Sequence, residues 1–560
     1  MAKGNLHSNF WQRHQTMMML SGIMLLALLF RLFLFRYRFA IGFDEPHYLQ
    51  LAMSGRLNGL REMCHPYWPP VFPAFIALFS WVISDLELAG RLASAFMGSA
   101  LVVPIFYLTG EFYPRRVATI SALLIACNPL LAFMNTSIMV ESTFMMLAIS
   151  GIALSWQAVK RGSVILVAIA AMLWSAAYLT RPDGIGFLLI FLGFLPIRLL
   201  FQRQPGQWKK TVVFMAIAVA CFAITSAPYV AYLHQQIGKW SLSLKWEVGR
   251  IDIDQFRSLS NDNHWLPVDM AYHLGDFTRI HELPEFSQQM QTNHYLALKE
   301  KAENFYQILN GAIPRLLSSF LLILLTVGIC RVNFTSDRIW LTVYLIAILS
   351  FFWFVVVPLF YVNDRYLIPV LPLCFIWIGQ GLDQLYRWLL SLVARTKLFA
   401  GQQMSQQLLV GLGISGLVLG LAYLPDLGRV VTLERHSRDI WTDAIEHRKA
   451  GEWLKHQSPT PPILMAQNHS IDFYAGNYNI RESINIPRNE WPRVLEYARY
   501  RQAQYLIINE RYCQEWYPEL LFLLREENIP AELKLVYKNI DPVSGLKLLI
   551  YQFTSSAPMS

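Results

Sequence analysis

Long runs of apolar residues, each about as long as a membrane-spanning helix, recur along the first 425 residues of the chain. About 20 consecutive apolar residues are enough for an α-helix to cross a bilayer. We predict eleven such helices, carried by runs near 17–37, 89–108, 117–134, 140–158, 164–180, 185–200, 212–233, 313–330, 339–358, 366–386 and 407–424. The pattern therefore predicts a polytopic α-helical membrane protein.

Two shorter elements are predicted in the first loop, residues 38–87. Residues 68–83 are apolar, but three prolines fall in what would be the first turn, so we expect a re-entrant or interfacial helix there. Before it, Leu49, Ala52 and Leu57 recur at helical spacing, and Gln50 and Ser54 lie on the opposite face. This spacing predicts an amphipathic helix lying in the membrane interface. An ordinary surface helix is the alternative.

The pattern changes after residue 425. Helical periodicity at 444–456, 491–501 and 518–526 alternates with short apolar segments at 462–466, 505–508, 533–537 and 546–553. Alternating helices and strands are typical of an α/β domain. We therefore predict a transmembrane domain over 1–425, with a long polar loop at 235–311, and a small soluble α/β domain over 426–560.

Composition and charge support a membrane protein and fix its orientation. The chain is 54% hydrophobic and 15% charged, with a mean hydropathy of +0.34. The net charge of +9 does not indicate nucleic acid, because basic residues recur in the short loops between spans, where they orient a membrane protein. With a cytoplasmic N-terminus, fifteen Lys and Arg lie in inner segments (1–16, 111–116, 157–163, 198–210, 331–338, 387–406) and five in outer ones (38–87, 135–141, 181–184, 359–366). This bias predicts the stated orientation.

Acidic and basic residues gather on the predicted outer side. The set comprises Asp44, Glu45, Glu141, Arg181, Asp183, Asp364 and Arg365. Ionisable groups near hydrocarbon are costly to hold and usually serve function. Each one alone could instead cap a helix or form a structural salt bridge, such as Asp364 with Arg365. Arg31, in mid-span, could likewise snorkel to a carboxylate or bind a lipid phosphate.

Carboxylates and arginines at headgroup level suit a reaction on a lipid-linked phosphate. A carboxylate can act as general base on an incoming hydroxyl or amine, and arginines can stabilise the departing phosphate. The donor would be embedded in the membrane and the acceptor would come from water.

Six segments carry a resemblance to a known family. They are the Asp44–Glu45 pair, the Pro-rich stretch 65–73 that begins at His65, the segment 89–94 with Arg91, Asn128-Pro129-Leu130 with 140–142, the segment 180–184, and 364–372. Their order and spacing resemble the GT-C superfamily of polyprenyl-phosphate-sugar glycosyltransferases, in the branch of bacterial relatives of protein O-mannosyltransferases and lipid A aminoarabinose transferases.

The resemblance implies inversion at the anomeric carbon, with Asp44 as general base and Glu45 beside it orienting a substrate. It implies that Glu141 faces the substrate cavity and that Arg181 lies near the donor phosphate. His65, Arg91, Asp183, Asp364 and Arg365 complete the candidate substrate-binding residues. No cofactor is expected, since many family members work without a metal. His47 and His65 near Asp44 are the grouping that could hold a divalent metal.

The predicted function is transfer of one sugar from an isoprenoid-phosphate carrier to a lipid, glycan or protein acceptor. The enzyme would lie in a bacterial inner membrane with its active site facing outward, in contact with membrane lipid and not with nucleic acid. Three alternatives stay open: a transporter or flippase of lipid-linked saccharides, a polymerase or ligase of such saccharides, and a non-catalytic scaffold.

Overall fold

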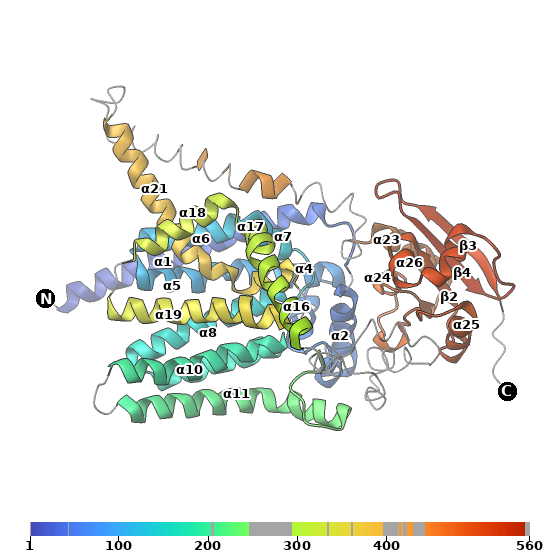
Figure 1. Cartoon of the computed structure of the whole chain (residues 1–560), viewed down its shortest axis with the longest axis horizontal. Helices are drawn as coiled ribbons and strands as arrows, with labels where there is room; N and C mark the ends of the chain where they lie inside the picture. The colour runs from blue at the N-terminus through green and yellow to red at the C-terminus, as the bar shows by residue number, and fades with distance from the viewer. Residues whose placement is uncertain are drawn as a thin grey trace.

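A bundle of long helices and a smaller α/β domain at one end of it make up the structure, a computed structural model (Figure 1). It describes residues 2–42, 44–202, 207–245, 294–332, 335–359, 362–395, 443–554 and isolated residues between 413 and 430. The N-terminus lies at the end of the bundle away from the α/β domain. Most of the predicted loop 235–311 lies outside the described residues.

Seven described helical segments are long and apolar enough to cross a membrane, or eight if a pair bent by 97° counts as one span. They are built from α1 (Ala2–Leu34), α4 and α5 (Leu86–Ala100, Val102–Phe112), α8 (Glu141–Arg161), α10 (Ile185–Gln202), α11 (Gln207–Ile237), α19 (Ser336–Phe351) and α21 (Phe375–Arg395). The bent pair combines α16 (His294–Gln307), α17 (Ile313–Leu316) and α18 (Ser319–Cys330). The chain is therefore a multi-pass membrane protein.

Besides the bent pair, two of the eleven predicted runs do not form a single helix of 18 or more residues among the described residues. The run 117–134 is divided into α6 (Arg115–Cys127) and α7 (Pro129–Met134), because Asn128 caps the second helix and Pro129 opens it. The run 164–180 forms α9 (Val164–Tyr178), which has only 15 residues. Most of the run 407–424 lies outside the described residues.

Arg31 is fully buried inside the bundle. Its guanidinium donates hydrogen bonds to the backbone carbonyls of Ala27 (2.9 Å), Gly98 (3.2 Å) and Ala126 (3.3 Å). These bonds join α1 to α4 and α6 and compensate the cost of burying the guanidinium. In this structure the side chain holds helices together and does not extend toward a lipid phosphate.

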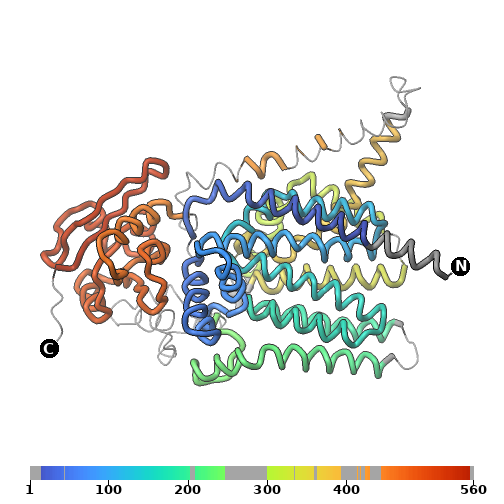
Figure 2. The backbone as a smooth tube through the Cα atoms, turned by 180° about the vertical axis from the view of Figure 1, so that it is seen from behind, coloured from blue at the N-terminus to red at the C-terminus, as the bar shows by residue number. Residues whose placement is uncertain are grey.

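The first loop forms a layer between the bundle and the α/β domain. It contains α2 (Glu45–Asn58), η2 (Leu60–Met63) and α3 (Val71–Ser80). Asp44 stands at the N-cap of α2 and Pro46 lies in its first turn. Figure 2 shows this layer between the helix bundle and the α/β domain. On the predicted polar face, Ser54 is partly exposed but Gln50 is buried, and its amide donates to Asn477 O and Ser483 Oγ of the α/β domain, both at 3.4 Å.

The C-terminal region is a small mixed sheet flanked by helices, which confirms the predicted α/β character. The strand order is β1-β2-β4-β3; β1 pairs with β2 in parallel, and the other two pairs are antiparallel. The strands are β1 (Leu464–Met465), β2 (Tyr505–Asn509), β3 (Leu533–Ile540) and β4 (Lys547–Phe553). The main helices are α23 (Ile445–Gln457), α24 (Ser470–Tyr474), α25 (Trp491–Tyr500), α26 (Glu510–Trp516) and α27 (Leu521–Arg525).

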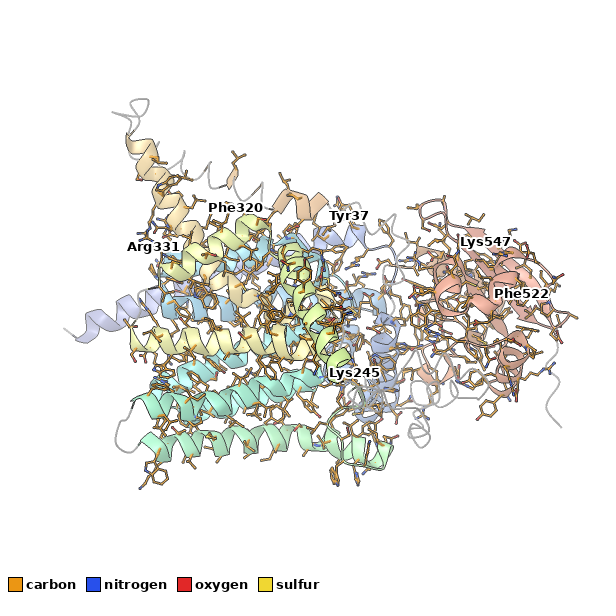
Figure 3. The ribbon with its side chains drawn as sticks, viewed as in Figure 1. Tyr37, Lys245, Phe320, Arg331, Phe522 and Lys547 are labelled. Carbon is orange, nitrogen blue, oxygen red and sulfur yellow. The ribbon has the colours of Figure 1, made fainter. Side chains whose placement is uncertain are left out.

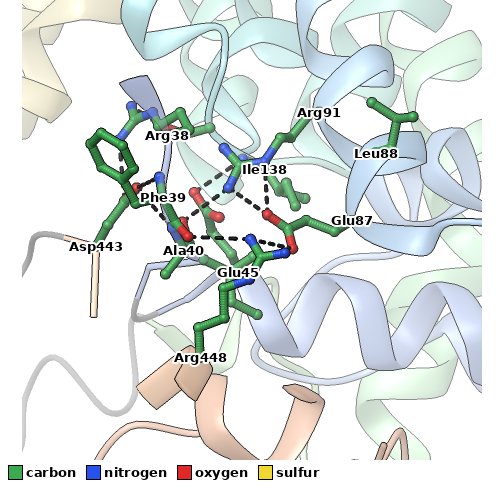
Figure 4. Close-up of polar contacts among 12 residues, drawn as sticks. Arg38, Phe39, Ala40, Glu45, Glu87, Leu88, Arg91, Ile138, Asp443 and Arg448 are labelled. Carbon is green, nitrogen blue, oxygen red and sulfur yellow. Dashed lines mark hydrogen bonds and ion pairs between the residues drawn. The ribbon is translucent and has the colours of Figure 1, made fainter. Parts of the chain in front are cut away.

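The α/β domain is attached to the bundle by polar contacts just before α2 (Figure 4). Asp443 accepts hydrogen bonds from Arg38 (3.3 Å) and from the backbone N–H of Phe39 (3.2 Å). Tyr474 accepts from the N–H of Ile41 (2.9 Å). Because these groups bind the chain between α1 and α2, the domain restrains the segment that carries Asp44.

Candidate active site

Five charged side chains form one continuous chain of ion pairs where the bundle meets the first loop. Arg365 donates to Asp44 Oδ2 at 2.9 Å and, through Nε, to Glu141 Oε1. Arg181 donates to the same Glu141 oxygen at 3.3 Å and holds Asp183 by two hydrogen bonds, of 3.1 and 3.0 Å. Residues 321 positions apart in sequence thus share one site. We call these five residues the charged cluster.

Arg365 reaches the cluster because of the turn that precedes α21. Asn363 accepts a hydrogen bond from the N–H of Arg365 (2.9 Å) and so starts the short helix α20 (Asp364–Leu367). Neighbouring residues in this turn point in different directions. Asp364 faces outward, where Arg315 binds it with two hydrogen bonds of 2.7 and 3.0 Å. Of the two predicted residues here, the structure therefore brings only Arg365 into the cluster.

Arg181 is positioned by the tight turn between α9 and α10. The turn η3 (Pro182–Gly184) folds back so closely that a Cβ at Gly184 would lie 2.5 Å from the backbone nitrogen of Tyr178. Only glycine fits there. The guanidinium also lies 5.1 Å from the ring centre of Phe144 and 5.4 Å from that of Tyr366. These aromatic contacts fix its position beside Glu141.

Glu141 is the most deeply buried carboxylate of the cluster. Its side chain is 2% exposed, whereas those of Asp44 and Arg365 are 27% and 25% exposed. It is the first residue of α8, where the helix dipole favours a negative charge. Its second oxygen, Oε2, has no hydrogen-bond partner among the described residues. Glu141 thus forms the buried bottom of the cluster, and Asp44 lies at its partly open rim.

Lys245 is a sixth charged residue at this site, and the sequence analysis missed it. Its ammonium lies 4.8 Å from the ring centre of Tyr67. Burial lowers the pKa of Lys245 to about 8, despite the nearby charge of Asp44. Figure 3 shows Lys245 at the end of the bundle that faces the α/β domain, and Arg331 near the other end. The sequence signal that could have identified Lys245 is its position among aromatic residues just after a predicted span.

Glu45 does not join Asp44 in the cluster. Its side chain is buried, and Oε1 accepts a hydrogen bond from the N–H of Ile138 at 3.1 Å (Figure 4). Burial raises the pKa of Glu45 to about 7, although Arg91 and Arg38 favour its charged form. The two adjacent acids therefore have separate environments: Asp44 faces the arginines of the cluster, and Glu45 faces the junction with the α/β domain.

The pKa of Glu45 predicts how stability depends on pH. The folded protein binds a proton at Glu45 up to about pH 7, while the unfolded chain releases it near the ordinary glutamate pKa of 4.5. Stability should therefore fall as the pH rises between these values. Glu45→Gln, which stays neutral, should match wild type at pH 4.5 and exceed it at pH 8 by on the order of 3 kcal/mol.

Apparent melting temperatures in detergent at the two pH values measure this difference. Glu62→Gln, at an exposed carboxylate, is the control and should behave as wild type at both. An advantage of Glu45→Gln that does not grow between pH 4.5 and pH 8 would contradict the assigned environment.

The two remaining predicted residues lie outside the cluster. Arg91 binds Glu87 and donates to the carbonyls of Ala40 (2.9 Å) and Thr136 (3.2 Å), so it lies at the domain junction. His65 accepts from the N–H of Tyr67 (3.1 Å), and its ring lies 4.8 Å from that of Trp68. His47 stacks on the same Trp68 at 4.1 Å. Within the described residues, no three His, Cys, Asp or Glu side chains are arranged to hold a metal.

Comparison with known proteins supports this picture. Residues 65–231 match the family model described as dolichyl-phosphate-mannose-protein mannosyltransferase. That segment includes Arg91, Glu141, Arg181 and Asp183. No protein with curated annotation matches the sequence.

Solved structures with the same fold cover nearly the whole chain. ArnT from Cupriavidus metallidurans, bound to undecaprenyl phosphate, is 14% identical; the match covers 96% of this chain and 98% of that one, with a TM-score of 0.54. The oligosaccharyltransferase AglB from Archaeoglobus fulgidus, in complex with an inhibitory peptide and a dolichol-phosphate, is 13% identical. The match covers 97% of this chain and 75% of that one, with a TM-score of 0.55. Identities this low show the fold alone.

The predicted GT-C resemblance is confirmed by these two findings together. The family match covers the middle of the membrane region, and the fold likeness extends over the whole chain. Residues 65–231 are thus similar to the dolichyl-phosphate-mannose-protein mannosyltransferase family, and the chain as a whole has the fold of ArnT and AglB.

Proposed function

We propose that the protein transfers one sugar from an isoprenoid-phosphate carrier to an acceptor outside the cytoplasm, with Asp44 as general base and inversion at the anomeric carbon. The observation that carries this proposal is the ion-pair chain from Asp44 through Arg365 and Glu141 to Arg181. This chain of ion pairs brings a partly exposed carboxylate and two guanidiniums together at one end of a membrane bundle. Proteins of the same fold have been solved with undecaprenyl phosphate or a dolichol-phosphate bound.

The proposed reaction has one bond-making and one bond-breaking event. The acceptor's hydroxyl or amine attacks the anomeric carbon while Asp44 takes its proton. The bond between the anomeric carbon and the phosphate oxygen breaks, and the carrier phosphate leaves with the electron pair. Arg181, Arg365 and Lys245 supply positive charge where the leaving phosphate gains negative charge.

Arg365 couples donor binding to the availability of the base. In the structure Arg365 donates hydrogen bonds to Asp44 Oδ2 and Glu141 Oε1 at the same time. A phosphate is a strong bidentate partner for a guanidinium. When the donor phosphate binds Arg365, the contact with Asp44 is exchanged, and the carboxylate becomes free to accept a proton. Asp44 is thus available as a base only when donor is bound.

The alternative of a transporter is disfavoured by the interior of the bundle. Transporters place ionisable residues near mid-membrane along the substrate path. Arg31, the mid-span arginine, is instead bound to three backbone carbonyls and has no open surface.

The orientation of the enzyme follows from the charge of its loops. Basic residues are concentrated in the loops at the end that carries the N-terminus, and the α/β domain lies at the opposite end. The positive-inside rule therefore puts the cluster and the α/β domain outside the cytoplasm. In a bacterium this is the outer side of the inner membrane, where lipid, glycan and protein acceptors are available.

Arg181→Ala is expected to weaken the use of donor more than that of acceptor. Removing a charged hydrogen-bond donor to phosphate should raise the KM for the polyprenyl-phosphate sugar about 10- to 100-fold. Steady-state kinetics of the purified protein, with each substrate varied in turn, measure the effect. Arg198→Ala is the matched control, because Arg198 pairs with Asp337 away from the cluster. Unchanged donor kinetics in Arg181→Ala would remove its phosphate role.

A further inference from the structure

A cavity of about 610 Å³ lies between the first loop, the end of α11 and the α/β domain. Its wall is shared by both parts of the protein: the first loop contributes the end of α2 with Arg61 to Pro66, α11 contributes Tyr232 and Gln236, and the α/β domain contributes residues 478–481. None of these residues belongs to the charged cluster. The cavity is large enough for several sugar units.

Two arginines from different domains line this cavity. Arg61 comes from η2 and Arg481 from η11 (Ile480–Glu482), and both are exposed. Within the described part of the chain, neither guanidinium makes an ion pair, in contrast to the arginines of the charged cluster. Glu62 is the one carboxylate among the described lining residues. Among the described lining residues, the cavity therefore has two arginines against one carboxylate, a small excess of positive charge.

The other polar groups in the wall suit a carbohydrate. Amides from Asn58 and Gln236 and the hydroxyl of Ser54 can pair with sugar hydroxyls, and Tyr478 offers a ring on which a sugar can pack. Glu62 can accept from two hydroxyls at once. A peptide would be expected to use an unpaired strand edge or an apolar groove. The lining instead favours a hydroxyl-rich, anionic ligand.

The cavity is connected to the charged cluster along the chain. Residues 64–66 form part of its wall, and the next residue, Tyr67, lies under the ammonium of Lys245. Tyr229 and Tyr232 of α11 hold this stretch by donating to His65 O and Cys64 O, both at 2.9 Å. The wall of the cavity is thus continuous in sequence with the residue that contacts Lys245.

We propose that this cavity binds an anionic carbohydrate, phosphorylated or carboxylated, as the recognition site for the acceptor. The proposal deepens the proposed function, on which it rests in naming the ligand as acceptor. The anion would lie between Arg61 and Arg481, one from each domain. The α/β domain would then select the acceptor, while the charged cluster acts on the donor.

The test is calorimetric titration of the full chain in phosphatidylcholine nanodiscs with maltopentaose and with maltopentaose carrying one terminal phosphate. Wild type is expected to bind the phosphorylated sugar about tenfold or more tightly than the neutral one. Arg61→Gln combined with Arg481→Gln should abolish this preference. Arg493→Ala, at an exposed pair on α25, should preserve it. In a second experiment the nanodisc also contains a phosphorylated glycolipid. If the glycolipid competes with the soluble phosphorylated sugar, the cavity also accepts the phosphorylated headgroup of a lipid.

Equal affinity of wild type for the two sugars would overturn the inference, and so would a preference that survives both substitutions. Binding of an unphosphorylated peptide in place of either sugar would also overturn it. The titration involves no donor and no turnover, so its result is independent of the proposed reaction. A phosphorylated sugar that binds but is never glycosylated would count against the reaction and leave the cavity assignment intact.

Discussion

Asp44→Asn is expected to lower the rate of sugar transfer about a thousandfold while the protein still folds and binds donor. A positioned general base contributes roughly 10²- to 10⁴-fold to a reaction. Asparagine has the size of aspartate and keeps an oxygen that can accept the hydrogen bond from Arg365. In the wild-type structure this bond is 2.9 Å long. It cannot take a proton from the acceptor. The loss should therefore appear in kcat, with little change in the KM for donor.

Transfer of a radiolabelled sugar from a polyprenyl-phosphate donor, under single-turnover conditions, measures this loss. Asp337→Asn is the matched control, because Asp337 also pairs with an arginine but is 55% exposed and lies away from the cluster. Gel filtration and thermal unfolding establish that both variants fold. Transfer by Asp44→Asn at the rate of wild type would show that another group is the base.

Arg365→Ala is expected to have the second large effect, on both activity and stability. It removes the link between Asp44 and Glu141 and leaves the buried Glu141 with Arg181 as its remaining cation in the cluster. Truncating one partner of a buried, hydrogen-bonded charge pair costs roughly 3–5 kcal/mol. The loss of transition-state charge stabilisation should lower transfer by about 10²- to 10³-fold.

Arg365→Lys separates the two effects. Lysine keeps the positive charge but lacks the planar fork that contacts two carboxylates and a phosphate together. Thermal stability should be largely restored in this variant, while transfer should stay at least tenfold below wild type. A lysine variant with full activity would contradict the bridging role of the guanidinium.

Much of the site could be predicted because its residues occur where the chain leaves or enters the membrane. Asp44, Glu141, Arg181 and Arg365 each adjoin an apolar run, so topology alone put them on one side. The first-loop helix could be located from its spacing and from Pro46. The helices and strands of the α/β domain could be located from alternating patterns of about 3.6 and 2 residues.

The rest depended on contacts that no local pattern encodes. Glu45 is adjacent to Asp44 in sequence, but successive helical residues point about 100° apart, so the two carboxylates face different neighbours. Lys245 enters the site because the segment that follows α11 brings its ammonium against Tyr67. Gln50 looked like a solvent-facing residue and is buried because the α/β domain covers it. The division of the apolar run 117–134 into α6 and α7 at Pro129 was not predicted.

The most direct test of the central claim is a cryo-electron microscopy structure of the full chain in nanodiscs with bound polyprenyl phosphate. The account predicts phosphate density within hydrogen-bond distance, about 3 Å, of Arg365 together with Arg181 or Lys245, and Asp44 released from Arg365. Phosphate bound instead at the opposite end of the bundle, with the pair between Arg365 and Asp44 unchanged, would contradict it.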